Sequence, residues 1–190
     1  MPRRLRALVA ALLPLGAGLP GVHATDAVPG EAEARPPSEY QVKAAFLYHF
    51  AQLVDWPAVP PPGQPFEIGV LGDDPFGPHL EAALAGKTVH ERPVRVQRYR
   101  TLPEPSRRPP LLFIAALDVQ EVERVVRALG PAPVLTVGEG PGFAGRGGMI
   151  GFRLTADGRV AFDINLRQAE RSGLRMSSQL LKLAHIVEGP

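Results

Sequence analysis

Two adjacent carboxylates, Asp73 and Asp74, stand directly after the apolar run 66–71. Ligands of open α/β sheets bind beyond the carboxyl ends of the strands, so this acidic pair could bind a ligand. As a catalytic pair it lacks a partner that the sequence places beside it. An aspartate followed by proline also suits a helix start, and Pro75 follows here. We favour this capping role, which predicts a helix that ends near Leu84.

Three arginines recur every four residues near the end of the chain. These are Arg167, Arg171 and Arg175, with Glu170 among them. On one continuous helix they would form a basic stripe, which could bind an acidic partner or a small anionic ligand. Surface charges are common and individually weak, so a solvated helix face is an equally good interpretation. We therefore treat these four residues as a candidate partner- or ligand-binding surface.

The helix that would carry this stripe is predicted to break. Gly173 favours a helix end, and Asn165 with Gln168 is typical of an N-cap and its partner. The segment 165–172 is then a short helical turn before a main helix over 174–187.

The glycine-rich segment 140–145 matches the GxGxxG pattern and follows an apolar run. A dinucleotide-binding loop must open a helix whose N-terminus faces the pyrophosphate. Residues 146–151 lead into a strand instead, and Pro141 removes an amide donor. We predict a glycine-rich turn that exposes Phe143, which is a further candidate contact for a partner or ligand.

The remaining reactive side chains form no recognisable catalytic or metal-binding arrangement. Ser177 and Ser178 have no glycine elbow beside them, so a nucleophilic serine is poorly supported. His79, His90 and His185 lack the spacing of metal ligands, and the chain has no cysteine. The sequence thus predicts a protein that is not an enzyme, has no metal and needs no cofactor. A hydrolase is a remote alternative.

The first residues have the layout of a secretory signal peptide. Arg3, Arg4 and Arg6 precede the uncharged apolar stretch 7–19, and small residues lead to a cleavage site after Ala24. The apolar stretch is too short for a spanning helix. We therefore expect export to the periplasm, with residues 1–24 removed.

Removal of the signal peptide changes the charge of the chain. The whole sequence has a formal charge of +2, and residues 1–24 hold three arginines and no acid, so the remainder has a charge of −1. Nucleic-acid binding rests on clustered basic residues, so no nucleic-acid partner is expected. Residues 25–39 lack large apolar groups and read as a flexible leader. Residues 40–190 are then a single domain.

Helical and strand patterns alternate through this domain, which predicts an α/β fold. We expect one three-layer, Rossmann-like domain with a mixed, partly parallel sheet and a C-terminal β-hairpin plus helix. In the first helix, an inward face of Val42, Ala45, Phe46, His49 and Leu53 is expected. The expected elements are helix 40–54, strand 66–71, a helix to residue 84, strands 93–99 and 111–115, helix 118–129, strand 134–137, a hairpin of 149–154 with 159–166, and helix 174–187.

Six blocks, in order over nearly the whole predicted domain, resemble the YfiR family of periplasmic regulators. They are YQVKAAFLYHFAQLVDWP at 40–57, GVLGDDPFG at 69–77, GKTVHERPVRV at 86–96, LLFIA at 111–115, VLTVGEGPGFAGRGGMIGF at 134–152 and FDINLRQAERSGLRMSSQLLKLA at 162–184. The resemblance implies a small periplasmic α/β protein. It also implies restraint of an inner-membrane diguanylate cyclase by binding to its periplasmic sensor region, and relief of that restraint by an outer-membrane-associated partner.

The chain departs from this family in its lack of cysteine. Members often carry cysteines in the first strand, before LLFIA and around the glycine-rich loop, where this chain has Gly69 and Ala144. Redox control should therefore not be carried over. Packing of Phe143 is expected to hold the loop instead.

Two further functional alternatives stay open. A small-molecule-binding protein could relay its ligand state to a partner from a pocket between the Asp73–Asp74 turn and the Arg171 region. The sheet edge at the predicted hairpin could also pair two copies of the chain in a homodimer.

Overall fold

The computed structural model describes residues 37–57, 63–115 and 118–189. The predicted signal peptide and residues 25–36 of the predicted leader lie outside these residues. Helix α1 (Glu39–Leu53) begins with a capping box, in which the Ser38 side chain accepts from Gln41 N and the Gln41 side chain accepts from Ser38 N. In the described part of the chain, no helix is long and apolar enough to cross a membrane.

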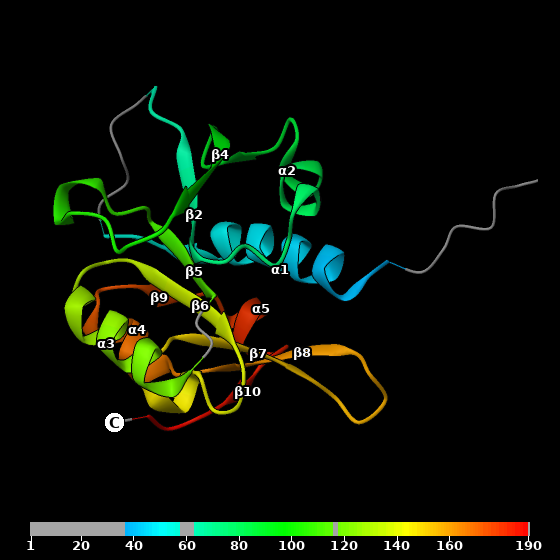
Figure 1. The fold of residues 1–190 in the computed structure, drawn as a ribbon, viewed down its shortest axis with the longest axis vertical. Helices are drawn as coiled ribbons and strands as arrows, with labels where there is room; N and C mark the ends of the chain where they lie inside the picture. Colours follow the sequence, from blue (N-terminus) through cyan, green and yellow to red (C-terminus); the bar gives the residue numbers. More distant parts are fainter. Residues whose placement is uncertain (1–36, 58–62, 116–117, 190) are drawn as a thin grey trace, which may run out of the picture. The chain divides into compact units, whose positions relative to one another are not determined.

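The described residues form an eight-stranded sheet in the order β10-β8-β7-β6-β5-β2-β4-β3. Strands β4, β2, β5, β6 and β7 run parallel, β3 and β8 pair antiparallel with β4 and β7, and β10 runs parallel to β8. The predicted mixed, partly parallel sheet is confirmed (Figure 1). The bounds are β2 (Phe66–Gly72), β3 (Thr88–Val89), β4 (Arg92–Tyr99), β5 (Leu111–Ala115), β6 (Leu135–Glu139), β7 (Ile150–Leu154), β8 (Val160–Ile164) and β10 (His185–Ile186).

Helices cover both faces of the sheet. On β5, Leu111 and Phe113 join the core beneath α1 and α2 (Pro78–Leu84). The alternate residues Leu112 and Ile114 join a second core beneath α3 (Val119–Leu129). Since successive strand side chains point to opposite faces, the three-layer prediction is confirmed.

The buried face of α1 differs from the predicted one. Leu47 and Phe50 are fully buried, and Phe50 lies 5.0 Å from Phe162 and 5.6 Å from Phe152 between ring centroids. His49 is exposed, so its expected place on the packed face is wrong. The helix is apolar around most of its circumference, and such a helix does not reveal from its sequence which side meets the sheet.

The hairpin of β7 and β8 is confirmed, with its turn at residues 155–159 and Gly158 at φ 78°. In Figure 1 this hairpin, in orange, projects away from the helices. Asp118 caps α3 by accepting from Glu121 N at 2.8 Å, as the predicted start at residue 118 requires.

The single helix expected over 174–187 is wrong. The segment divides into β9 (Arg175–Met176), α5 (Ser178–Leu181) and β10. Strand β9 pairs with β1 (Val54–Asp55) in a two-stranded antiparallel ribbon. Pairing with residues far away in sequence therefore overrides a helical pattern of apolar residues. Ser177 starts the short helix by accepting from Leu180 N at 3.2 Å.

Candidate functional site

A buried ion cluster joins α1 to the carboxyl end of β6. Lys43 has a side chain only 4% exposed, and its ammonium binds the carboxylates of Glu39, one turn earlier, and Glu139, the last residue of β6. Tyr40 donates from its hydroxyl to Glu139 Oε1 at 3.1 Å. The two carboxylates compensate the cost of burying the ammonium, because a buried charge is tolerated only when it is paired.

The protonation states in this cluster are fixed by the same contacts. Burial tends to lower the pKa of Lys43, but hydrogen bonds to Glu139 and Glu39 outweigh it and raise that pKa above its ordinary value. Burial, and then the charge of Glu139, raise the pKa of Tyr40. Near neutral pH the pair is therefore an ammonium and a neutral phenol. Neither group is suited to act as a general base.

A cleft of about 580 Å³ opens beside Lys43. It lies where α/β sheets commonly bind ligands, at the carboxyl end of a parallel strand, and its volume is in the range of small-molecule sites. Arg153 on one wall binds Asp163 through Nε at 2.9 Å. The lining residues are Glu39, Lys43, Glu139, Gly140, Pro141, Gly142, Phe152, Arg153, Leu154 and Asp163.

The turn that forms one wall of this cleft is closed by Phe143. Its ring lies in a slot between two glycines, because a Cβ on Gly138 or Gly148 would come within 2.2 Å of it. Phe143 is 3% exposed, so the expected exposure of this residue is wrong. Packing of Phe143 in the loop is confirmed. The ring avoids water by entering space that only glycine leaves open.

The glycine-rich segment does not open a helix of the dinucleotide-binding kind. It passes through the 3-10 turn η2 (Ala144–Arg146) and enters β7 directly. The interpretation of residues 140–145 as a turn is confirmed.

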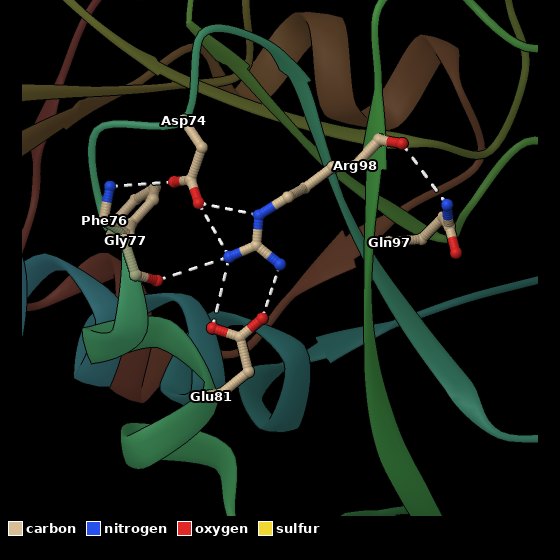
Figure 2. Close-up of polar contacts among 6 residues, drawn as sticks. All are labelled: Asp74, Phe76, Gly77, Glu81, Gln97 and Arg98. Atoms are coloured by element: carbon tan, nitrogen blue, oxygen red, sulfur yellow. Dashed lines mark hydrogen bonds and ion pairs between the residues drawn. The ribbon is translucent and has the colours of Figure 1, made fainter.

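Asp74 takes part in an ion network with two residues that the sequence analysis did not single out. Figure 2 shows the guanidinium of Arg98 between the carboxylates of Asp74 and Glu81. Arg98 Nε lies 2.8 Å from Asp74 Oδ2, and Arg98 Nη2 donates to Gly77 O at 3.2 Å. The hydrogen bond from Arg98 lowers the pKa of Glu81.

The predicted helix cap at Asp73 and Asp74 is wrong. Helix α2 begins at Pro78, with Gly77 as its N-cap and no side-chain cap. Asp74 Oδ1 accepts from Phe76 N at 2.8 Å and thus closes a local turn before the helix. Asp73 is exposed.

The four candidate residues near the end of the chain do not share one helix. Arg167, Glu170 and Arg171 are exposed on α4 (Leu166–Arg171), and Arg175 is exposed on β9, where it faces Asp55 in the register. Gly173 ends the helical turn with φ 74°, as predicted. The arginines spaced by four residues therefore lie on two elements, α4 and β9, and not along one helix.

Lys43 and Glu139 were missed from the sequence. The signal available was the Glu39–Lys43 spacing of four, together with a lysine inside an otherwise apolar helix. Within the described residues, no group of three or more histidines or acidic side chains could hold a metal ion.

The sequence comparisons agree with this fold. A model of the family described as YfiR/HmsC-like matches residues 40–185. No curated protein matches the chain. The matched range begins in α1 and ends in β10, so it includes Tyr40, Lys43 and Glu139 of the ion cluster, though not Glu39, and the arginine-bearing elements α4 and β9. The chain therefore belongs to the YfiR/HmsC-like family.

Proposed function

We propose that the protein is a periplasmic regulator that restrains or modulates an inner-membrane signalling protein of the diguanylate cyclase type by direct binding. The family match over residues 40–185 is the observation that carries this proposal. The family's members are regulators and are not known as enzymes. The signal-peptide pattern at residues 1–24 supports the location, because it predicts export.

The chemistry of the described residues is consistent with action by contact. The buried cluster holds Lys43 as an ammonium and Tyr40 as a phenol, which suits a fixed binding surface better than proton transfer. Arg171 and Arg175 are exposed and offer charge to an acidic partner. We place the contact with the cyclase's periplasmic sensor region on these arginines, and an outer-membrane-associated partner would relieve the restraint.

The test is co-purification of the tagged protein with membrane diguanylate cyclases of the same organism. Arg171→Glu with Arg175→Glu should retain the fold and lose the cyclase. The matched control is Arg124→Glu with Arg127→Glu, which changes the charge equally on exposed positions of α3 and should retain the cyclase. Unchanged cyclic-di-GMP after deletion of the gene would refute the regulatory role. If a folded variant with Arg171→Glu and Arg175→Glu still restrained the cyclase fully, the contact would lie elsewhere.

The cleft beside Lys43 favours a second function, in which a bound small molecule reports to the partner. Lys43 lines this cleft together with Glu39 and Glu139, so a polar ligand in the cleft would lie beside this ion cluster. Thermal shifts should be measured across anions, nucleotides and amino acids. A ligand of this cleft should raise the Tm of the wild type and of Lys182→Met, but not that of Lys43→Met. No shift by any compound would count against this function.

A further inference from the structure

The residues from 92 to 108 concentrate positive charge. They contain six arginines and one glutamate, although the chain without its first 24 residues has a formal charge of −1. Strand β4 supplies Arg92, Arg95 and Arg98, and Arg100 follows its end. The basic charge thus lies along one strand and the loop after it.

Strand β4 is also an edge strand over most of its length. It pairs with β2 on one side over six residues. On its other side, β3 reaches only Arg92 and Pro93, and Val94 N donates to Lys87 O at 3.1 Å. Beyond Val94, the described residues provide no strand on this side.

The geometry of the strand identifies the groups on its open side. Successive residues of a strand direct their N–H and C=O groups to opposite edges. Because Val94 N points toward β3, the N–H and C=O of Val96 and Arg98 point outward as well. The Gln97 amide donates to Arg98 O at 3.3 Å (Figure 2). The Val96 N–H, the Val96 C=O and the Arg98 N–H are thus available to an added strand.

The exposed arginines at this edge are available for charge pairing. Arg98 is neutralised by Asp74 and Glu81. Arg95, Arg100 and Arg107 are exposed and form no ion pair with any residue that the structure describes. Unpaired backbone groups flanked by cations complement an extended chain that carries carboxylates.

We propose that the open edge of β4 is a docking site at which a partner protein adds an extended acidic segment as a further strand. This inference rests on the proposed function, in which the protein acts by binding a partner. Backbone hydrogen bonds to Val96 and Arg98 hold the added strand, and its carboxylates pair with Arg95 and Arg100. Charged side chains also protect free edges from nonspecific pairing, so the site rejects strands that lack acidic residues.

The probe is a short fluorescent peptide in which pairs of glutamates alternate with pairs of valines, so that an added strand carries carboxylates on both faces. It is compared with a peptide in which lysine replaces glutamate. The acidic peptide should bind the purified mature protein and slow amide hydrogen exchange at Val96 and Arg98. Arg95→Glu with Arg100→Glu should weaken binding at least about tenfold. Arg124→Glu with Arg127→Glu, the matched control on α3, should leave the affinity unchanged.

A second pair of variants separates strand addition from charge attraction. Val96→Pro removes the outward N–H and should abolish binding. Val96→Ala also removes the valine side chain but keeps the N–H, so it should bind. Three results would each overturn the docking site. The lysine peptide could bind as tightly as the acidic one, or a folded Val96→Pro could keep the wild-type affinity. The peptide could also slow amide hydrogen exchange only in strands other than β4. Retention of a cyclase by Arg95→Glu with Arg100→Glu would exclude β4 as its contact and leave the proposed function intact. If the wild-type protein co-purified with no cyclase, the proposed function would be refuted, whereas the binding of the acidic peptide to β4 would be unaffected.

Discussion

The ring of Phe143 fills a slot that its neighbours leave by having no side chain. Gly138 comes from β6 and Gly148 from the segment before β7, so the ring connects the two sides of the turn. Because a full ring is buried here, its contacts contribute more to the stability of the loop than any surface ion pair.

Phe143→Ala should therefore lower the free energy of unfolding by about 3–5 kcal/mol, as is usual for a buried phenylalanine. Urea unfolding measures the loss. Leu154→Ala is the control, since Leu154 is 50% exposed and its truncation should cost no more than about 0.5 kcal/mol. A loss for Phe143→Ala as small as that of the control would show that the slot contributes little.

Tyr99 links stability to alkaline pH. Burial, followed by its hydrogen bond to Glu67, raises the pKa of Tyr99 above its ordinary value. A group whose pKa is raised on folding gives stability that is complete below the unfolded pKa, about 10 for tyrosine, and is lost as pH rises toward the folded pKa. The folded protein therefore becomes less stable as pH rises above about 10.

Tyr99→Phe should remove this dependence. The variant should be about 1–2 kcal/mol less stable than the wild type at pH 7, because it lacks the hydrogen bond, and the difference should narrow above about pH 10. Denaturant unfolding at several pH values measures both stabilities. Parallel curves for the two proteins would contradict the linkage.

The residues of the candidate site illustrate what sequence patterns can predict. Asp74 stands out in the sequence because it follows an apolar run, and Arg171 stands out because it lies four residues from both Arg167 and Arg175. The role of Arg171 as a contact stays a prediction. The contacts of Asp74 were not identifiable, since Arg98 is 24 positions away and meets it only through the pairing of β4 with β2. From the sequence alone, Lys43 resembles a solvated helix residue. In the fold it pairs with Glu139, which lies at the end of β6 and 96 positions away.

At the scale of elements, Asn165 ties α4 to the glycine-rich turn. Its Oδ1 accepts from Gln168 N at 3.0 Å, as the predicted N-cap requires, and its Nδ2 donates to Ala144 O at 2.9 Å. Asn165 is fully buried, so water cannot replace either bond without a rearrangement.

Asn165→Ala should cost about 2–4 kcal/mol, because it removes a cap and leaves a buried carbonyl without a donor. Asn165→Asp keeps the cap acceptor but sets a carboxylate against the Ala144 carbonyl, and it should also be destabilised. Urea unfolding, with circular dichroism as the probe, compares the two variants. Wild-type stability of Asn165→Ala would show that water substitutes for both bonds.

Elements with local determinants were predictable. The β7–β8 hairpin follows from its turn residues, and α3 follows from Asp118 and an amphipathic pattern. The 174–187 segment was not, because its helical pattern is overruled by pairing of β9 with β1, more than a hundred positions away. The partner and end of each strand depend on such distant contacts, which a local pattern does not contain.

At the scale of the whole molecule, residues 36–190 form one structural unit. Their contacts run from α1 through the sheet to β10, so they should unfold in a single cooperative transition. We expect a protein that lacks residues 1–36 to keep the stability of the mature chain within about 0.5 kcal/mol, because the leader composition offers little apolar surface.

Ser38→Ala in the shortened protein is the control, and loss of its cap should cost about 1 kcal/mol. Guanidinium unfolding compares the three proteins. If the shortened protein were less stable than the mature chain by as much as Ser38→Ala costs, the leader would be shown to pack on the domain.

The fit of one aromatic ring between two glycines also bears on how the family diverges. Neither Gly138 nor Gly148 can gain a side chain while Phe143 keeps its ring, since any side chain at either glycine would occupy the space of the ring. Relatives with a larger residue at 138 or 148 should carry a smaller one at 143. Substitutions at these three positions should thus be correlated across the family tree, and an intermediate with only one of them changed should be selected against.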